Sequence, residues 1–505
     1  MRKTLIGGAL LAATAAAFAT APASAAWHKA STPHFVIYAD ETPAKLSAFA
    51  AKLEKFDKAV RQVRGMADPK VGDGNRLTVF VVPDMKAVQK LAAAMPNLTP
   101  NLAGFYSGRA EGSIAVVPKR ASEYDPDDQS TFFHEYAHHL MYFDLNEPVP
   151  MWYSEGFAEF MSTATFGKDG SVMLGRAALG RAGAVDDKRT FPLEKMLAAD
   201  YDRLSEPEWE ALYARSWLLT HYLTFETTRK GQIQLYLKDI AAGKNSLAAA
   251  RSAFGDFALL DRNLHGYIGR GRMAAFKIAA AALPVGPVAV EALTPGAAAI
   301  MPLRMPLKAG VPKAEKLALV QAIRALAAKY PGDALAQITL AEAEFELAQF
   351  AAAEAAADRA LAASPQSVDA MIYKGRAILE QAAMDEKGKT FADARAWFSK
   401  ANKIDSEDPE PLMLFHSAYV RDSGRPTPNA VAALHYASDL APQDTGLRMQ
   451  SAYQYLRDGK LAEARKALVP IAYDPHGRAA AKSAQAAIAK IDAGDAKAAQ
   501  TAMER

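Results

Sequence analysis

The chain has 505 residues, of which half are hydrophobic and 23% are charged, and its formal net charge is +3. This length exceeds one typical domain and predicts two or three. The near balance of charge argues against a nucleic-acid-binding protein, which needs a basic surface to neutralise phosphates. The chain has no cysteine, so disulfides and thiolate metal ligands are excluded, and any metal site must use His, Asp and Glu.

The first 25 residues have the pattern of a secretory signal peptide. A basic start precedes a short, alanine-rich apolar stretch, and the small residues Ala23 and Ala25 then indicate a cleavage site. A membrane anchor is the alternative, but the apolar stretch is short and is closed by Pro22. No later stretch is long and apolar enough to span a bilayer. We therefore expect residues 1–25 to be cleaved, no stable membrane insertion, and a soluble bacterial protein that is periplasmic or secreted.

Residues 26–282 are predicted to form a mixed α and β domain. Two β-branched runs predict strands at 34–40 and 76–83. The apolar residues between them have helical spacing and predict a helix at 43–65. Residues 104–118 contain two β-prone segments around a glycine-containing turn and predict a hairpin. From about residue 126 to 275 the pattern is mostly helical. The fold class is therefore α+β for this part of the chain.

Residues 283–312 are rich in proline and glycine and poor in charge. This composition predicts an extended connector, with room for a small strand pair, at a domain boundary.

Residues 313–505 are predicted to form an all-α solenoid. Prolines that follow helical segments recur at intervals of 34, 44, 33 and 33 residues, at positions 331, 365, 409, 442 and 475. A period of 33–34 residues with two helices per unit is the spacing of tetratricopeptide repeats, and the long interval contains an insertion at 382–391. The alternative is a generic alanine-rich bundle. Because repeat surfaces often bind extended peptides or proteins, we expect this domain to recruit a substrate or a protein partner.

The segment His134-Glu-Tyr-Ala-His138 places two histidines four residues apart. On a helix these imidazoles lie on one face, one turn apart, and can bind one metal ion. Glu135 lies beside that point, where its carboxylate can take a proton from a metal-activated water. The pentapeptide also arises by chance. The alternative is therefore that the histidines are ordinary helix residues and that Glu135 is a solvated charge.

A second segment with two glutamates, Glu155 and Glu159, follows the histidines. The number of residues in between is enough for the end of one helix, a turn and the start of a second helix. Pro148 and Pro150 force a turn, and the next helix can fold back to deliver Glu155 to the histidines as a third metal ligand. Glu159 is one turn further along the same face, where it can accept an N–H from a ligating imidazole. For Glu159 a solvated surface charge remains an equal alternative.

The segments 134–138 and 152–160 together resemble the gluzincin metallopeptidases, the clan of thermolysin and the leucine-type aminopeptidases. The arrangement is most similar to exported peptidase-MA-like proteins that carry tetratricopeptide repeats. The resemblance implies a thermolysin-like catalytic domain with Zn²⁺ held by His134, His138 and Glu155, and Glu135 as the general base. Sixteen residues separate the second histidine from the glutamate, whereas the aminopeptidase branch has eighteen.

Residues 213–223 resemble the aminopeptidase segment in which a tyrosine donates its hydroxyl to the oxyanion. Tyr213 is the matching position, although the charged pair that follows in that branch is replaced by Ala214 and Arg215. His221 and Tyr222 are second choices for this role, and a buried structural role for Tyr213 is equally open. The resemblance also implies that the strand at 113–117 is the sheet edge along which a peptide substrate binds.

These patterns predict a zinc-dependent peptidase of the cell envelope. The main rival is a non-catalytic tetratricopeptide scaffold whose protease-like domain only binds metal. In that case Glu135→Gln would have no effect on function. A third possibility is a metal-free structural domain, in which Glu155→Ala would leave the metal content unchanged.

Overall fold

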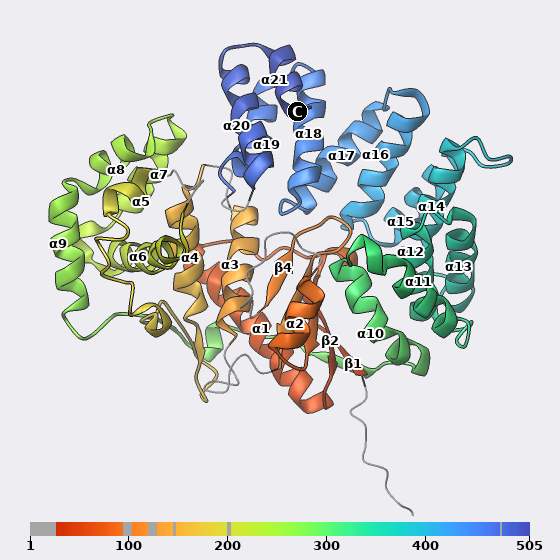
Figure 1. The fold of residues 1–505 in the computed structure, drawn as a ribbon, viewed down its shortest axis with the longest axis horizontal. Helices are drawn as coiled ribbons and strands as arrows, with labels where there is room; N and C mark the ends of the chain where they lie inside the picture. Colours follow the sequence, from red (N-terminus) through yellow and green to blue (C-terminus); the bar gives the residue numbers. More distant parts are fainter. Residues whose placement is uncertain are drawn as a thin grey trace, which may run out of the picture.

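A computed structural model describes residues 27–93, 104–119, 129–144, 148–198, 204–474 and 477–504. The predicted signal peptide lies outside these residues. The described part consists of a mixed α and β region followed by a helix-rich C-terminal part. Figure 1 shows the sheet at the centre, with helices α4–α9 on its left, α10–α17 on its right and α18–α21 above it.

A mixed sheet forms the centre of the N-terminal region. Within the described residues it has six strands in the order β4-β5-β3-β2-β1-β9. The strands are β1 (Trp27–Ser31), β2 (Phe35–Asp40), β3 (Leu77–Val82), β4 (Phe105–Ser107), β5 (Ile114–Pro118) and β9 (Ala289–Ala292). Strands β2, β3 and β5 are parallel to one another, and β4, β1 and β9 each pair antiparallel with their neighbours.

Side chains of the central strands alternate between two apolar cores, as a two-residue period requires. In β3, Val79 and Val81 belong to the core shared with α1 (Pro43–Arg64) and α3 (Ser130–Asp144). Phe80 of the same strand belongs to a second core with α2 (Met85–Ala92) and α10 (Pro295–Ala309). The sheet is therefore covered by helices on both faces. The core shared with α1 and α3 is the larger of the two, and we call it the larger core.

Further helices and a small antiparallel sheet complete the N-terminal region. The helices are α4 (Met151–Ser162), α5 (Leu193–Ala198), α6 (Glu206–Phe225), α7 (Gln232–Ala241), α8 (Ser246–Phe254) and α9 (Phe257–Ile268). The small sheet contains β6 (Thr165–Phe166), β7 (Val172–Leu174) and β8 (Phe276–Ile278). Short 3₁₀ turns are η1 (Asp73–Asn75), η2 (Leu179–Arg181), η3 (Thr227–Arg229) and η4 (Ala280–Ala282).

The predicted strands at 34–40 and 76–83, the helix at 43–65 and the hairpin at 104–118 are confirmed as β2, β3, α1 and β4–β5. The prediction that the strand at 113–117 is the sheet edge is wrong. β5 is paired on both sides, with β3 and with β4, so β4 is the outer strand of the sheet as described. The sequence lacked a signal for this order because strand order depends on pairing between distant segments.

The prediction of an extended connector at 283–312 is wrong for the second half of the segment, whereas the strand that it allowed for is present. The segment contains β9, which pairs with β1, and the helix α10, which includes Pro302 and Pro306. A proline inside a helix costs about 3 kcal/mol, which is why the composition argued against one. Burial of apolar residues of α10 such as Ile300 and Met301 offsets that cost.

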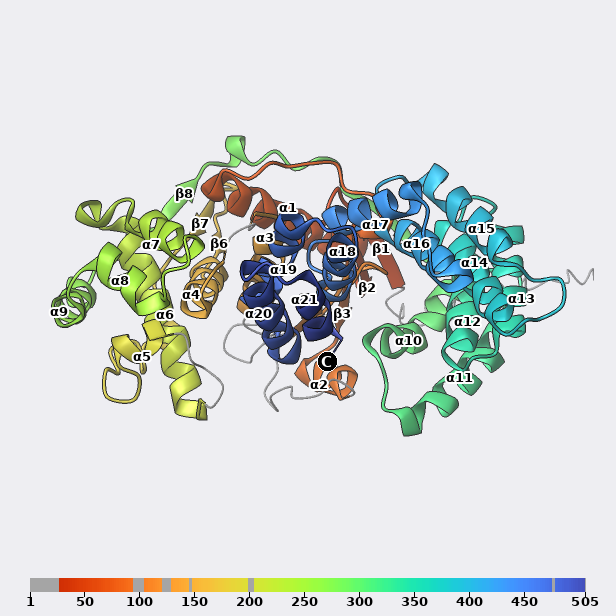
Figure 2. The same ribbon diagram turned by 90° about the horizontal axis from the view of Figure 1, so that it is seen from above.

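The C-terminal helices pack in sequence order, each against its neighbours. They are α11 (Lys313–Ala327), α12 (Ala334–Glu346), α13 (Phe350–Ala363), α14 (Val368–Ala383), α15 (Phe391–Ile404), α16 (Pro409–Ser423), α17 (Pro428–Leu440), α18 (Thr445–Arg457), α19 (Leu461–Ala472), α20 (Arg478–Asp492) and α21 (Ala496–Met503). We call α10–α21 the helical array. In both views the array forms an arc beside the central sheet (Figures 1 and 2). The predicted insertion at 382–391 falls largely on the connection between α14 and α15.

A search of the described residues finds no helix with the length and hydropathy needed to cross a bilayer.

One buried carboxyl of the helical array should make stability depend on pH. Burial and the nearby Glu111 raise the pKa of Glu410 to about 7. The positive charges of Arg376 and Lys308 act in the opposite direction, and Arg376 Nη1 lies 2.9 Å from Glu410 Oε1. The acidic side chain of Asp369 adds to the rise. The folded state therefore binds the Glu410 proton more tightly than the unfolded chain does, and this stabilises the fold at low pH. The stabilisation is lost as pH rises from about 4.5 through 7.

We expect Glu410→Gln to remove this dependence. Denaturant unfolding at pH 5 and pH 8 should show that the wild-type protein loses about 2–3 kcal/mol more than the variant over this interval. The exposed Glu463→Gln is the control and should behave like the wild type. Equal losses in the wild type and Glu410→Gln would contradict the assignment.

Candidate metal centre

Helices α3 and α4 lie side by side and carry the candidate metal-binding residues. In α3 the apolar residues Phe133, Ala137 and Leu140 are buried in the larger core, which fixes the rotation of the helix about its axis. With these residues against the core, His134 and His138 lie on the face of α3 next to α4. Helix α4 begins directly after Pro150, and all of its residues from Trp152 to Met161 are buried.

Gly156 sets how closely α4 approaches α6. A Cβ at this position would overlap the Ser216 carbonyl oxygen and the Thr220 hydroxyl of α6. The glycine after Glu155 therefore allows close helix packing, and this packing holds Glu155 against α3. The sequence showed the Glu-Gly pair without showing that the glycine contacts α6.

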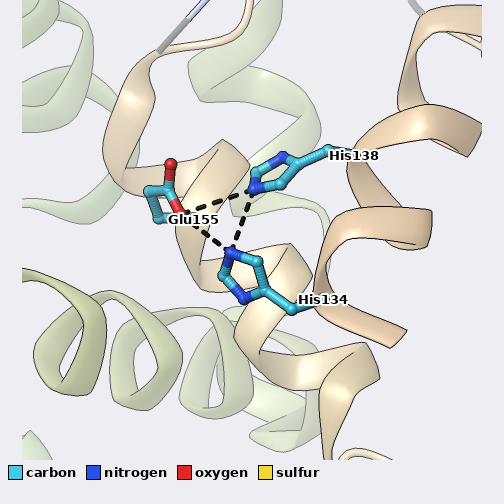
Figure 3. Close-up of side chains that lie close together, drawn as sticks. All are labelled: His134, His138 and Glu155. Atoms are coloured by element: carbon cyan, nitrogen blue, oxygen red, sulfur yellow. Dashed lines mark hydrogen bonds and ion pairs between the residues drawn. The ribbon is translucent and has the colours of Figure 1, made fainter. Parts of the chain in front are cut away.

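Three side chains from the two helices meet at one point (Figure 3). His134 Nε2 and His138 Nε2 are 3.2 Å apart, and Glu155 Oε2 is 3.3 Å from the first and 3.4 Å from the second. The three candidate ligand atoms thus form a nearly equilateral triangle. Glu155 and His138 are buried, and His134 is largely so.

The triangle fits a zinc ion. Zinc bound to His nitrogen and carboxylate oxygen at about 2.0–2.1 Å in a tetrahedral arrangement places its ligand atoms about 3.3–3.4 Å apart. The donor set of two imidazoles and one carboxylate, with no sulfur, is also typical of catalytic zinc sites that keep a fourth position open. The residues present therefore fit a catalytic zinc ion.

The electrostatics of the site favour a cation. Burial by itself lowers the pKa of His134, but the carboxylates of Glu155 and Glu159 overcome this effect and raise it to about 10. A site that stabilises a positive charge on an imidazole so strongly also stabilises a divalent metal ion in its place, with release of protons on binding.

Glu159 lies behind His134, on the side away from the triangle. Its Oε1 is 3.4 Å from His134 Nδ1, and Arg181 of η2 contacts both of its oxygens, Nη2 to Oε1 at 2.6 Å and Nε to Oε2 at 3.1 Å. The alternative of a solvated surface charge does not describe this residue, which is 5% exposed. Burial raises the pKa of Glu159, but His134 and Arg181 outweigh it and lower the pKa to about 2.

Two further residues that the sequence did not indicate support the histidines. The Ser154 hydroxyl lies 3.2 Å from His138 Nδ1, so both imidazoles have a partner on the nitrogen that faces away from the triangle. Such contacts fix the tautomer and orientation of metal-binding imidazoles. Arg181 is the second, and only its place in the turn η2 brings it to Glu159. No spacing rule could have found it.

Glu135 is half-buried on α3 between the two histidines of the motif. Its charge acts on Tyr106 of β4 and on Tyr213 of α6. Tyr213 lies beside His134, so the carboxylate acts on a group at the edge of the triangle, and the motif predicts that Glu135 lies next to the metal-binding point without being a ligand.

Tyr213 projects from α6 toward the same site. Its ring centroid is 6.0 Å from that of His134, and Arg181 lies over its face at 5.0 Å. Burial and the nearby carboxylates of Glu155 and Glu135 raise its pKa well above 10, so the hydroxyl stays protonated and can donate a hydrogen bond. Tyr213 is half-buried and not a core residue.

The second choices for the tyrosine role lie elsewhere. His221 Nε2 is 3.0 Å from the carbonyl oxygens of Gly175 and Ala274, and its Nδ1 is 2.8 Å from the Tyr267 hydroxyl. Tyr222 contacts Arg229. These contacts account for both side chains structurally.

A second histidine and carboxylate group is formed by His34, which directly precedes β2, and by two acidic residues in the second half of α1. His34 Nδ1 is 3.0 Å from Glu54 Oε2, and Asp57 accepts hydrogen bonds from Arg61 Nε at 2.8 and 2.9 Å and from the Tyr136 hydroxyl at 2.8 Å. The Arg61 guanidinium already neutralises Asp57, so we interpret this group as a buried ion-pair network. Because Tyr136 belongs to α3, the network also anchors that helix to α1.

Residues 15–251 match the family model of the M9 peptidases, described as collagenase. The matched span contains both helices that form the triangle. The chain is a zinc metallopeptidase, a hydrolase that acts on peptide bonds. A search of curated proteins gives no match.

The match confirms two predictions for this peptidase, the enzyme class and the zinc cofactor. It names a collagenase family, so the narrower prediction of a peptidase-MA-like family with tetratricopeptide repeats stays a prediction.

Proposed function

We propose that His134, His138 and Glu155 hold the zinc ion of this peptidase and that Glu135 is its general base. The observation that carries the proposal is the triangle of ligand atoms, whose edges of 3.2, 3.3 and 3.4 Å fit tetrahedral zinc. Zinc bound there supplies a Lewis acid that polarises the substrate carbonyl and lowers the pKa of a water molecule.

Four residues around the proposed zinc site have separate roles in the reaction. Glu135 takes a proton from the attacking water as its oxygen bonds to the carbonyl carbon. The same carboxyl then gives the proton to the amide nitrogen as the C–N bond breaks. Glu159 contacts Nδ1 of His134 and Ser154 contacts Nδ1 of His138, and these contacts fix the orientation of the two imidazoles. The donor hydroxyl of Tyr213 stabilises the negative charge that develops on the carbonyl oxygen.

The role of Tyr213 predicts a defined loss of activity. Tyr213→Phe removes the hydroxyl and leaves the ring contacts with His134 and Arg181 in place. We expect kcat to fall by about 10²–10³-fold with little change in KM, because the lost hydrogen bond forms in the transition state. Steady-state kinetics of the two proteins test this.

Tyr222→Phe is the matched control, since that hydroxyl contacts Arg229 away from the site. It should leave kcat within a factor of about two. A Tyr213→Phe enzyme with unchanged kcat would assign Tyr213 a structural role only.

The substrate proposal follows from the family match. The matched model is described as collagenase, so we propose extended polypeptide substrates, with unfolded collagen as the first to test. Incubation of residues 26–505 with gelatin and with casein, followed by mass-spectrometric mapping of the new termini, gives the cleavage sites. Absence of cleavage of both by the zinc-loaded protein would contradict the proposal and favour the non-catalytic scaffold.

We further propose a tetratricopeptide-like architecture for the C-terminal helices and export of the protein. Helix pairs that begin at 334, 368, 409, 445 and 478 support the first proposal, since neighbouring pairs pack in succession. The sequence of residues 1–25 supports the second. The mass of the protein recovered from the periplasm or medium of an expressing bacterium should correspond to a chain that begins at residue 26.

A further inference from the structure

The turn between β4 and β5 packs against the helical array and buries Ala110 and Ser113 there, whereas a hairpin turn ordinarily faces water. The turn comprises residues 108–113, and Ala110 within it is 1% exposed. Its methyl group belongs to an apolar cluster formed by α17, α18 and the loop between them. The cluster residues from the array are Leu434, Ala437, Ala441 and Leu447.

Polar groups of the same turn are bonded to the loop that precedes α18. Ala110 N donates to Asp444 Oδ2 at 2.8 Å, and Gln443 Nε2 donates to Ser113 Oγ at 3.1 Å. Asp444 and Gln443 are therefore shared between the array and the hairpin. The turn is held both by apolar burial and by directed hydrogen bonds.

A second loop of the sheet docks beside the first. In η1, Asn75 Nδ2 donates to the Leu440 carbonyl at 2.6 Å, and Gly74 N donates to Asp405 Oδ2 at 3.2 Å. A Cβ on Gly74 would overlap the Asp408 carboxylate, so the backbone of this loop lies directly against the array.

The hairpin and the array both reach the helix that carries the histidines. The Tyr106 hydroxyl of β4 lies 2.6 Å from Nδ1 of His139, the residue after the candidate ligand His138. Arg448 Nη2 of α18 donates to the Tyr142 carbonyl in the last turn of the same helix at 3.4 Å. The array therefore contacts α3 directly through Arg448. It also contacts α3 indirectly, because the hairpin on which it packs carries Tyr106.

The opposite edge of the sheet is joined to the array as well. β9 pairs with β1, and α10 follows it and covers the second face of the sheet. The described sheet is therefore held at β9 on one edge and at the β4–β5 hairpin on the other.

We propose that the helical array is an intramolecular clamp whose partner is the β4–β5 hairpin of its own catalytic region, and that this clamp positions α3 through the contact of Tyr106 with His139. The apolar cluster of α17 and α18 is covered by Ala110 of the hairpin, so this part of the array is not free to recruit a separate protein. The effect on activity rests on the proposed peptidase site, whereas the docking itself does not.

Gly108 allows the link to be perturbed without loss of the surrounding structure. A Cβ there would lie 2.7 Å from the Tyr106 hydroxyl, 3.0 Å from Gln443 Cγ and 3.1 Å from the Gln443 carbonyl oxygen. Gly108→Ala should therefore displace Tyr106 from His139. We expect kcat/KM for fluorescein-labelled gelatin to fall by about tenfold to a hundredfold, since a misplacement of about 1 Å costs that much. Zinc content and Tm should change little.

Gly286→Ala is the matched control, because a Cβ at that exposed loop position meets nothing within 4 Å. Tyr106→Phe, which removes the linking hydroxyl, should reproduce the loss. The double variant should lose less than the product of the two single effects, as expected for one shared link. Unchanged kcat/KM in both single variants, or fully multiplicative losses, would overturn the positioning role.

A crosslink tests the docking independently of activity. The chain has no cysteine, so Gly74→Cys with Asp408→Cys introduces the only pair, at positions in direct contact. On mild oxidation the pair should form a disulfide in most molecules, detected by gel mobility. The oxidised enzyme should cleave gelatin as fast as its reduced form, because the clamp does not open during turnover.

Failure of the crosslink to form would show that the docking does not exist in solution. Loss of activity on oxidation that returns on reduction would show that the array moves, and would replace a fixed clamp by a lid. If the wild-type protein cleaves neither gelatin nor casein, the proposed substrates fail, while the crosslink yield still tests the clamp.

Discussion

Replacement of Glu135 by glutamine should lower kcat by about 10²–10⁴-fold, the usual contribution of a general base, while zinc stays bound. The amide cannot accept the proton of the attacking water. The triangle of His134, His138 and Glu155 does not include Glu135, so the metal-binding atoms are unchanged. Gelatin cleavage rates and zinc content by mass spectrometry, measured on the same preparation, separate the two effects.

The control is Glu210→Gln, which changes an exposed glutamate of α6 and should leave both quantities unaltered. If Glu135→Gln retains full activity with zinc bound, Glu135 is not the general base. If the variant loses zinc as well, the motif geometry assigned to Glu135 is wrong.

Replacement of Glu155 by alanine should remove zinc and, with it, activity. The carboxylate is fully buried and supplies one of three candidate ligand atoms. Two imidazoles cannot complete the three-ligand set that catalytic zinc sites use. Mass spectrometry should show about one zinc per chain in the wild-type protein and little in the variant after dialysis.

Glu159→Gln is the comparison that makes this result specific. Glu159 contacts His134 only through the outer nitrogen, so its loss should weaken zinc binding by about 10–100-fold without abolishing it. Zinc content that is indifferent to Glu155 would exclude the triangle as the zinc site. Equal zinc loss in both variants would mean that Glu159 is itself a ligand.

The local elements of the sheet region could be read from periodicity. The helix at 43–65 and the strands at 34–40 and 76–83 have strong apolar patterns, and their boundaries agree with α1, β2 and β3 to within two residues. The helix α10 could not be read in this way. Its prolines signal a break, and only its burial against the sheet and the array favours the helix.

The candidate site shows the same division. Helical spacing predicts that His134 and His138 share a face, because that distance is set by the helix itself. Ser154 and Arg181 carry no such signal. Ser154 reaches His138 because α4 packs on α3, and Arg181 reaches Glu159 from a short turn 22 residues later in the chain.

Sequence patterns alone were enough to predict a mixed α and β region followed by a helix-rich part, the helical pair of histidines, and Glu155 as the candidate third ligand. These depend on local spacing, which the backbone geometry of a helix or strand converts directly into position. The packed fold was needed to show that β4 is the outer strand, that Arg181 and Ser154 support the imidazoles, and that the array contacts the β4–β5 hairpin. Those features arise from contacts between segments far apart in the chain, whose free energy comes from burial and hydrogen bonding and leaves no periodic trace in the sequence.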